Sequence, residues 1–340
     1  MDLPAPSYGA DASGMICGYL FEGGGAAVPL DSHAAVGMLA SLRQGTDGPP
    51  RFAWLHFNLA HAGAQRWLER HGGLSPAFHD ALRDELRSTR IERDDDALVA
   101  VVNDVHFDFG FEASDIATLW VSLDSRLVVT ARQSPLRSID QLRTAIKNGE
   151  RLRSTVELLE RLLRAQADVL VDIVRSVTRR VDKVEDELLA GHLDAKRARL
   201  GALRRLLVRL QRLLAPAPAA LLRLLQHPPA WMAELDTQQL REASEEFSVA
   251  LQDMASLQER IKLLQEEVAA MVNERTSRSL FVLTVMTVLA LPINILAGLF
   301  GMNVGGVPLA DNRHGFWVVA AIVAAFTLVA AWLAFRKRRP

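Results

Sequence analysis

Cysteine is almost absent from this sequence. The 340 residues contain a single one, Cys17, which excludes an intramolecular disulfide framework and a zinc site built from several thiolates. The count fits a reducing cytoplasm. Segment 1–14 also lacks a basic region followed by an apolar core, so no cleavable signal is expected.

Charged side chains are missing from two long stretches near the C-terminus. Residues 280–300 and 316–335 contain no Asp, Glu, Lys, Arg or His, and each is close to the roughly 20 apolar residues that a membrane-spanning helix needs. The sequence therefore predicts two transmembrane helices joined by a short connection, residues 301–315.

Basic residues lie directly before the first of these stretches and directly after the second. Arg275 and Arg278 precede the first, and the tail 336–340 after the second is rich in Lys and Arg. Because Lys and Arg are enriched on the cytoplasmic side of membrane spans, both termini are expected in the cytoplasm and the connection 301–315 outside.

Residues 1–150 have the composition of a mixed α and β domain. Runs rich in Val, Leu, Ile and aromatic residues predict strands, and Asp124 with Ser125 predicts a tight turn between the last two. Ser75 and Ser138 are expected to cap two helices, and Gly149 to end the second of them. The predicted strands are 15–21, 52–57, 97–103, 118–123 and 126–131, and the predicted helices are 64–70, 76–87 and 139–148.

Residues 151–235 have the periodicity of a helical hairpin with arms 152–189 and 195–214, and Pro216 and Pro218 are expected to interrupt the second arm. That arm is basic, an alternative sign of RNA or membrane-surface binding. We favour a packing role without nucleic acid, since leucines supply an apolar face and no aromatic residues interleave the arginines. Its basic residues are Lys196, Arg197, Arg199, Arg204, Arg205, Arg209 and Arg212.

Residues 236–279 carry the strongest periodicity, about five heptads that predict a stalk helix continuous with the first span. The apolar seam needs a partner, which is either another copy of the chain or the helix 152–189 of the same chain. The seam residues are Leu240, Ala243, Phe247, Ala250, Met254, Leu257, Ile261, Leu264, Val268 and Met271.

The stalk is also acidic. If several stalks were arranged around a common axis, these carboxylates would raise the cation concentration at an inner vestibule. The other interpretation is a solvated outer face that pairs with the basic hairpin. The acids are Glu242, Glu245, Glu246, Asp253, Glu259, Glu266, Glu267 and Glu274.

Polar and small residues of the first span share one helix face, within an arc of about 100°. Polar groups inside a membrane usually face water or the bundle interior and mark ion paths, although helix packing explains threonines equally well. Asn294 favours an ion path, because an amide in hydrocarbon is costly. This pore stripe consists of Ser277, Leu280, Thr284, Thr287, Leu291, Asn294 and Gly298.

Gly301, Met302 and Asn303 follow the pore stripe directly and predict a pore mouth, because irregular backbone at membrane depth needs protein or a water-filled path. The pore stripe has no carboxylate, imidazole or thiolate, so the ion is expected to keep most of its water. Asp311 and His314 are the candidate proton or cation sites of the loop. A zinc site at His56, His106 and Asp108 is a less favoured hypothesis.

This arrangement resembles the CorA family of divalent metal-ion transporters. The segment LPINILAGLFGMNVGGVPL, residues 291–309, is similar in particular to the ZntB zinc-transport branch, and 123–143 resembles the soluble domain. The resemblance implies a homopentameric funnel in a bacterial inner membrane. In it the first spans line the pore, and Gly301, Met302 and Asn303 recognise hydrated cations at the entrance.

The expected function is therefore transport of Zn2+ without a resident cofactor. A Mg2+ channel, or a broad one that also passes Co2+ or Ni2+, is the alternative within the class. A membrane-anchored coiled-coil scaffold is the alternative outside it. An enzyme is not expected, since no nucleophile motif, metal-ligand spacing or phosphate loop stands out.

Overall fold

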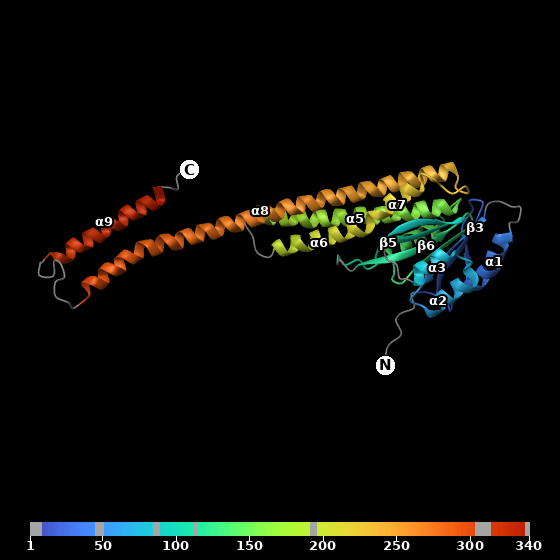
Figure 1. The fold of residues 1–340 in the computed structure, drawn as a ribbon, viewed down its shortest axis with the longest axis horizontal. Helices are drawn as coiled ribbons and strands as arrows, with labels where there is room; N and C mark the ends of the chain where they lie inside the picture. Colours follow the sequence, from blue (N-terminus) through green and yellow to red (C-terminus); the bar gives the residue numbers. More distant parts are fainter. Residues whose placement is uncertain are drawn as a thin grey trace, which may run out of the picture. The chain divides into compact units, whose positions relative to one another are not determined.

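The computed structural model describes residues 9–44, 51–83, 89–111, 115–190, 196–302 and 314–336. The chain divides into two compact units, Met1–Gln265 and Glu266–Pro340, and Figure 1 shows its elements in order. The finer division expected from the sequence, with boundaries at 150, 235, 279, 300, 315 and 335, stays a prediction.

A seven-stranded mixed sheet forms the centre of the first unit, with the strand order β2-β1-β3-β7-β6-β5-β4. Strands β3 and β7 pair in parallel and every other neighbouring pair is antiparallel. The mixed α and β class is therefore confirmed. The strands are β1 (Met15–Glu22), β2 (Val28–Leu30), β3 (Arg51–Asn58), β4 (Arg90–Asp94), β5 (Ala97–Val105), β6 (Ile116–Leu123) and β7 (Leu127–Arg132).

All five predicted strands exist, but the two edge strands were missed. β2 has three residues and β4 reads RIERD, so neither carries an apolar run. Short or charged edge strands are usual because they discourage pairing with other chains. The turn between β6 and β7 is also longer than predicted, since the Asp124 side chain accepts hydrogen bonds from the amides of Arg126 (2.7 Å) and Leu127 (2.9 Å).

Four short helical elements bury one face of the sheet. Leu55, Phe57, Phe78 and Trp120 belong to this core and are at most 2% exposed. The sequence predicted two of the helices and missed the first, α1. The elements are α1 (Ser32–Gln44), α2 (Ala62–Trp67), the π-helical turn Leu68–Gly72 and α3 (Pro76–Arg83).

Of the two serine caps predicted from the sequence, Ser75 holds its predicted position and Ser138 does not. Ser75 directly precedes α3, and its carbonyl accepts from the His79 amide (3.4 Å). Its Oγ has no hydrogen-bond partner in the part of the chain that the structure describes, and Asp94 Oδ2 accepts from the Ala77 amide instead (3.2 Å). Ser138 lies inside α4 (Arg137–Lys147), whose N-cap is Leu136. In both cases a carboxylate from a distant strand serves the helix start, which local sequence cannot reveal.

Three helices contact the other side of the sheet: α5 (Thr155–Leu189), α6 (Lys196–Leu214) and the short α7 (Pro216–Leu224). The N-terminal part of α8 (Glu234–Phe300) packs on these helices and runs beside them in Figure 1. Helix α6 ends at Leu214, so the arm is interrupted before Pro216 as predicted. Pro216 then begins α7, where a proline in the first turn loses no hydrogen bond.

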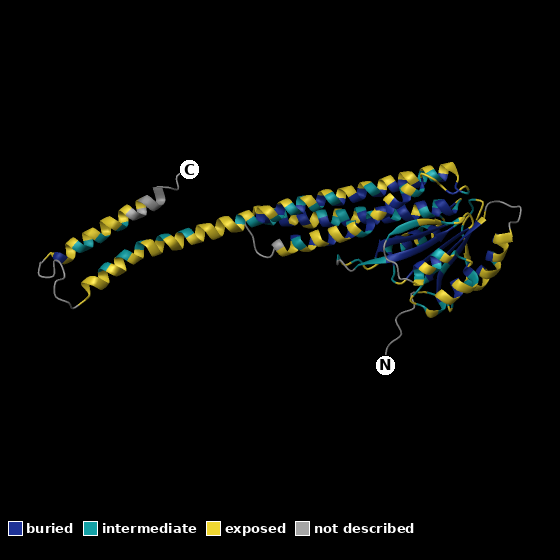
Figure 2. Ribbon diagram, viewed as in Figure 1, coloured by how far each residue is buried: buried dark blue, intermediate teal, exposed yellow. Residues whose placement is uncertain are grey.

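The heptad seam of α8 is buried within the single chain. Leu240, Phe247, Met254 and Ile261 are fully buried, and Figure 2 shows buried residues along this part of α8. Polar contacts to α5 and α6 flank the seam: Arg164 to Glu246 (2.9 Å), Arg260 to Asp182 (2.8 Å) and Gln258 to Gln211 (2.9 Å). The partner of the seam over residues 240–264 is therefore the same chain, and another copy is not needed to bury it.

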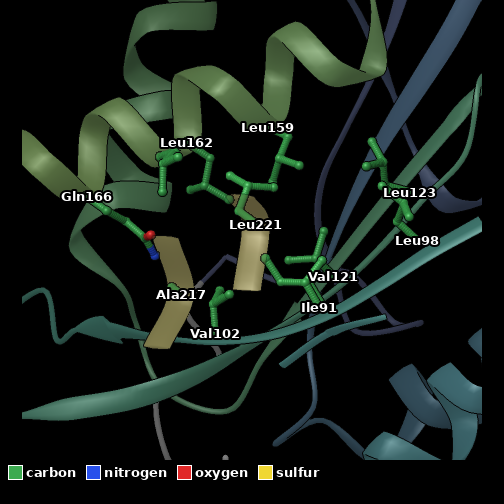
Figure 3. A pocket seen from close by; sticks show the side chains of 12 residues that line it. Ile91, Leu98, Val102, Val121, Leu123, Leu159, Leu162, Gln166, Ala217 and Leu221 are labelled. Carbon is green, nitrogen blue, oxygen red and sulfur yellow. The ribbon is translucent and has the colours of Figure 1, made fainter. Parts of the chain in front are cut away.

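A small apolar cavity lies between the sheet and helices α5 and α7. Its volume is about 30 Å³, and its walls are aliphatic except for Gln166, which Figure 3 shows beside Ala217 and Val102. Gln166 is 6% exposed, and its Nε2 donates to no described group. An unsatisfied buried donor costs about 1–3 kcal/mol.

Replacement of Gln166 by leucine is therefore expected to stabilise the protein. The volume is nearly conserved and the unpaired amide is removed, so we expect a gain of about 1 kcal/mol, measured as a higher thermal midpoint of the detergent-solubilised protein. Gln166→Ala is the matched control, which removes the same amide but enlarges the cavity and should lower the midpoint. A lower midpoint for Gln166→Leu would contradict the assignment.

Asp104 is a buried carboxylate whose charge the fold disfavours. It is 1% exposed, and burial raises its pKa to about 6, although hydrogen bonds from Ser138 and Val105 act in the opposite direction. The folded chain therefore binds this proton more tightly than the unfolded chain. Its contribution to stability grows as the pH falls from 7 towards 4, by up to about 3 kcal/mol over the full titration.

Asp104→Asn is expected to abolish this contribution. Burial lowers the pKa of His56 well below its usual value, so the contribution of His56 to folding stability decreases towards low pH. The pH dependence of the stability of the wild type alone therefore combines both effects. We therefore compare wild type and Asp104→Asn at each pH by thermal unfolding in detergent. The thermal midpoint of the wild type should rise relative to that of the variant as the pH falls from 7 to 5. A difference between the two midpoints that does not change with pH would refute the prediction.

Candidate functional site

The second unit contains a helical segment suited to a membrane. The C-terminal part of α8 holds an 18-residue window that is poor in charge and wholly unburied, and α8 is the one helix in the described ranges long and apolar enough to cross a membrane. Helix α9 (Gly315–Arg336) covers the second predicted span, and its apolar stretch among the fully described residues is shorter, Gly315–Val329. Two crossings therefore stay a prediction.

All seven residues of the pore stripe lie on this one helix and all are exposed. They are Ser277, Leu280, Thr284, Thr287, Leu291, Asn294 and Gly298. Leu280 and Leu291 are each 57% exposed. The backbone is helical throughout, so the shared face inferred from the sequence holds in the structure.

The two threonines of the pore stripe present oxygen acceptors. Thr284 Oγ1 donates to the Leu280 carbonyl (2.8 Å), and Thr287 Oγ1 donates to the Leu283 carbonyl (2.9 Å). Each hydroxyl hydrogen is thus directed back to the helix, which leaves the oxygen lone pairs for an outside donor or a cation. The threonines therefore suit the hydration shell of a positive ion.

Asn294 adds an amide without an internal partner. Within the described part of the chain its side chain forms no hydrogen bond, and the residue is exposed. Pro292 lies two residues earlier inside α8 and lacks the N–H that would bond to the Val288 carbonyl. On an ideal helix Val288 borders the pore stripe. This carbonyl is a further oxygen at the edge of the pore stripe, and the sequence analysis did not name it.

The predicted pore mouth is described only in part. Helix α8 ends at Phe300, after which the Gly301 amide donates to Ala297 (2.9 Å) and the Met302 amide to Leu299 (3.4 Å). A Cβ at Gly301 would lie 3.0 Å from the Ala297 oxygen, which favours glycine there. Met302 is 51% exposed.

Of the three remaining loop candidates, the structure describes only His314. Asn303 and Asp311 lie outside the described residues. His314 directly precedes α9, and its carbonyl accepts from the Val318 amide (3.2 Å). The structure thus brings Gly301 and Met302 to the end of the pore stripe, while the roles of the three other loop residues stay predictions.

The less favoured zinc hypothesis at His56 is wrong. His56 is fully buried, its Nδ1 lies 2.8 Å from Thr130 Oγ1, and its Nε2 accepts from Arg132 (3.1 Å). Both ring nitrogens are occupied. No group of three or more His, Cys, Asp or Glu side chains in the described ranges is arranged to hold a metal ion. Within residues 280–300 the side-chain oxygens available to an ion are neutral ones.

The chain combines an α/β domain with one long helix, whose C-terminal part is free of charge and carries polar residues on one face. These features are those of a membrane protein with a large domain outside the membrane. Residues 50–338 match the family model described as CorA-like Mg2+ transporter protein, so the chain belongs to the CorA family. The resemblance found in the sequence is thereby confirmed.

Two curated relatives match most of the chain. The divalent cation transporter CmaX of Pseudomonas aeruginosa is 28% identical over 333 residues, which are 97% of each chain. The zinc transport protein ZntB of Yersinia enterocolitica is 24% identical over 279 residues, 82% of this chain and 85% of the relative.

Solved structures share the fold. The full-length CmaX structure superposes with a TM-score of 0.78 at 28% identity and covers 96% of this chain and 98% of its own. The complete structure of the CorA magnesium transporter from Methanocaldococcus jannaschii gives 0.75 at 20% identity over 95% and 98% of the two chains. The predicted architecture of a mixed α/β domain followed by a long helix is therefore confirmed.

Proposed function

We propose that this chain is a divalent-cation transporter of a bacterial inner membrane and that its physiological cargo is Zn2+. The observation that carries the proposal is the pore stripe, which places neutral side-chain oxygens on one face of the exposed C-terminal part of α8, where residues 280–300 carry no charge. An ion that crosses there keeps most of its water, because neutral oxygens hydrogen-bond to hydration water but do not replace it tightly.

The transport path needs several copies of the chain. One α8 helix with one α9 helix cannot enclose water, so we propose a homopentamer in which five α8 helices line the pore and five α9 helices face the lipid. Both termini lie in the cytoplasm. Residues 301–315 form the external entrance, where Gly301, Met302 and Asn303 recognise the hydrated ion.

Zinc as cargo is supported by the sequence after Asn303, which resembles the zinc branch, and by relatives named as zinc transport proteins. The relative CmaX is named for divalent cations in general, and this favours a broad or Mg2+-selective channel as the second candidate. Competition decides between them: with Zn2+ as cargo, a large excess of Mg2+ should leave Zn2+ uptake into proteoliposomes nearly unchanged.

The direct test is uptake of Zn2+ by liposomes that contain the purified full-length protein. Uptake should be fast in the wild type and strongly reduced in Asn303→Ala. Thr327→Val is the control for general damage to the membrane segment, because Thr327 bonds back to its own helix (Oγ1 to Val323, 2.8 Å) and lies on α9, outside the proposed path. Wild-type liposomes without uptake, or equal loss in both variants, would overturn the proposal.

The membrane potential suffices as the driving force. Inward movement of a divalent cation is favourable by roughly 4 to 5 kcal/mol at 100 mV. We propose Asp311 and His314 as the groups for a coupled proton, since the spans have no titratable side chain. An imposed pH gradient should then change the rate of Zn2+ uptake, and a rate that ignores the gradient would exclude coupling.

A further inference from the structure

Helix α6 carries a basic groove that the proposed transport path does not use. The groove has a volume of about 660 Å³, and the described residues that line it are Arg204, Arg205, Val208, Arg209, Arg212 and Leu213. Arg204 donates to the amide oxygen of Gln265 (3.4 Å). In the described part of the chain no carboxylate pairs with any of the four arginines. Val208 is nevertheless 46% exposed at their centre.

A flank of α8 has the complementary character. Val249 and Leu263 are 59% and 56% exposed, although they lie on a helix whose seam is fully buried. Exposed Glu242 and Asp253 share this flank, and neither has an ion-pair partner among the described residues. The flank is therefore acidic and aliphatic, whereas the groove on α6 is basic and aliphatic.

The groove and the flank of one chain face different directions. Gln258 contacts Gln211, and Gln265 contacts Arg204, so α6 packs on the side of α8 that carries heptad position e. Val249 and Leu263 occupy position c, which lies about 150° from e around the helix. The flank therefore turns away from the α6 helix of its own chain.

We propose that the groove on α6 receives the Leu263 flank of α8 from a neighbouring copy. Two different surfaces that meet between identical chains form a heterologous contact, and such contacts close into a ring when the rotation allows. The proposal rests on the oligomer of the proposed function and names the surface that assembles it. A nucleic acid is the poorer occupant, since none of the described residues that line the groove is aromatic.

The register of the contact follows from the ring. In a closed ring a given residue lies at the same height along the ring axis in every copy. Two residues that lie at one height within a chain are therefore also at one height between adjacent copies. Within the chain Arg204 lies level with Gln265 and Gln211 with Gln258, which places Val208 level with residues 261–262. Leu263 is the flank residue at that height. Asp253 lies about 6 Å along the helix from the level of Arg212, within reach of an arginine side chain.

Disulfide trapping tests this register in full-length protein in detergent. Cys17→Ser removes the native thiol, after which Val208→Cys is combined with Leu263→Cys in one variant and with Val249→Cys in another. Val249 is the matched control, because it is equally exposed on the same flank but lies about 21 Å further along the helix. Disulfides form only when Cα atoms approach within about 7 Å.

The expected result is a ladder of cross-linked chains in the Leu263→Cys variant, at least about tenfold stronger than in the Val249→Cys variant. An oligomer of unchanged mass and intact Zn2+ uptake without this preference would overturn the contact surface while the proposed function stands. A wild-type particle with the mass of one chain would overturn both. Nucleic acid or lipid that copurifies with wild type and is lost in Arg209→Glu, with no cross-linking, would assign the groove to that ligand instead.

Discussion

Replacement of Asn294 by leucine should lower Zn2+ uptake into proteoliposomes by about 10- to 100-fold. The amide is exposed on α8 without an internal hydrogen bond, so its oxygen is free for the hydration shell of an ion. A hydrogen bond to a charged species contributes about 1.5–3 kcal/mol, which corresponds to this loss in rate. Leucine would also add an apolar ring next to Leu291, and apolar constrictions block ions by excluding water.

Two controls separate this effect from damage to the fold. Ile295→Leu changes the neighbouring exposed residue and should leave uptake unchanged, and Asn294→Gln keeps the amide and should retain part of the activity. The oligomeric mass of all three variants should equal that of the wild type. Uptake at the wild-type rate in Asn294→Leu would show that the ion does not pass this face of α8.

Replacement of Phe247 by alanine should destabilise the folded chain by about 3–5 kcal/mol, the usual cost of removing a buried aromatic side chain. Phe247 is fully buried in the seam of α8. One turn earlier, Ser244 Oγ donates to the Pro218 carbonyl on α7 (3.3 Å), so this part of the seam faces the same chain. The thermal midpoint in detergent should fall by about 10 °C.

The same experiment distinguishes the two partners that the seam had in the sequence analysis. Burial within one chain predicts a loss of stability that is independent of protein concentration, with the oligomer mass retained. A seam between copies predicts the reverse, a loss of mass with little change in the unfolding of each chain. Leu235→Ala is the control, because Leu235 is 52% exposed on the same helix and should shift the midpoint little.

The sequence predicted the elements whose pattern is strong over many residues. The heptads of α8 and the arms α5 and α6 have apolar spacing that fixes the helix and its buried face. The charge-free stretches were found from their length and lack of charge alone. The pore stripe also followed from spacing, since one continuous helix preserves the angle between its side chains.

The errors arose where distant residues determine local structure. Asp94 and Asp104 supply the carboxylates at the starts of α3 and α4, and neither lies near those helices in the sequence. Strand β4 is too charged to read as a strand until β5 provides its pairing. The partner of the α8 seam stayed open because a heptad pattern shows that a face must be buried and not which helix buries it.

The candidate site divides in the same way. The residues of the pore stripe were placed on one face from their spacing, and the structure has all of them on one continuous helix, α8. The Val288 carbonyl could have been found from Pro292, since proline always removes the donor of its own position. The groove on α6 was visible only as a run of arginines, and its complement on α8 requires the packing of both helices.

Thiol modification tests the ion path most directly. In a Cys17→Ser background, Thr287→Cys places a thiol on the pore stripe, and Val282→Cys places one on the opposite side of α8. A membrane-impermeant, positively charged thiol reagent should block Zn2+ uptake in proteoliposomes with Thr287→Cys and leave Val282→Cys unaffected. Equal block of both variants, or no block of an active Thr287→Cys transporter, would contradict the assignment of this face of α8 as the path of the ion.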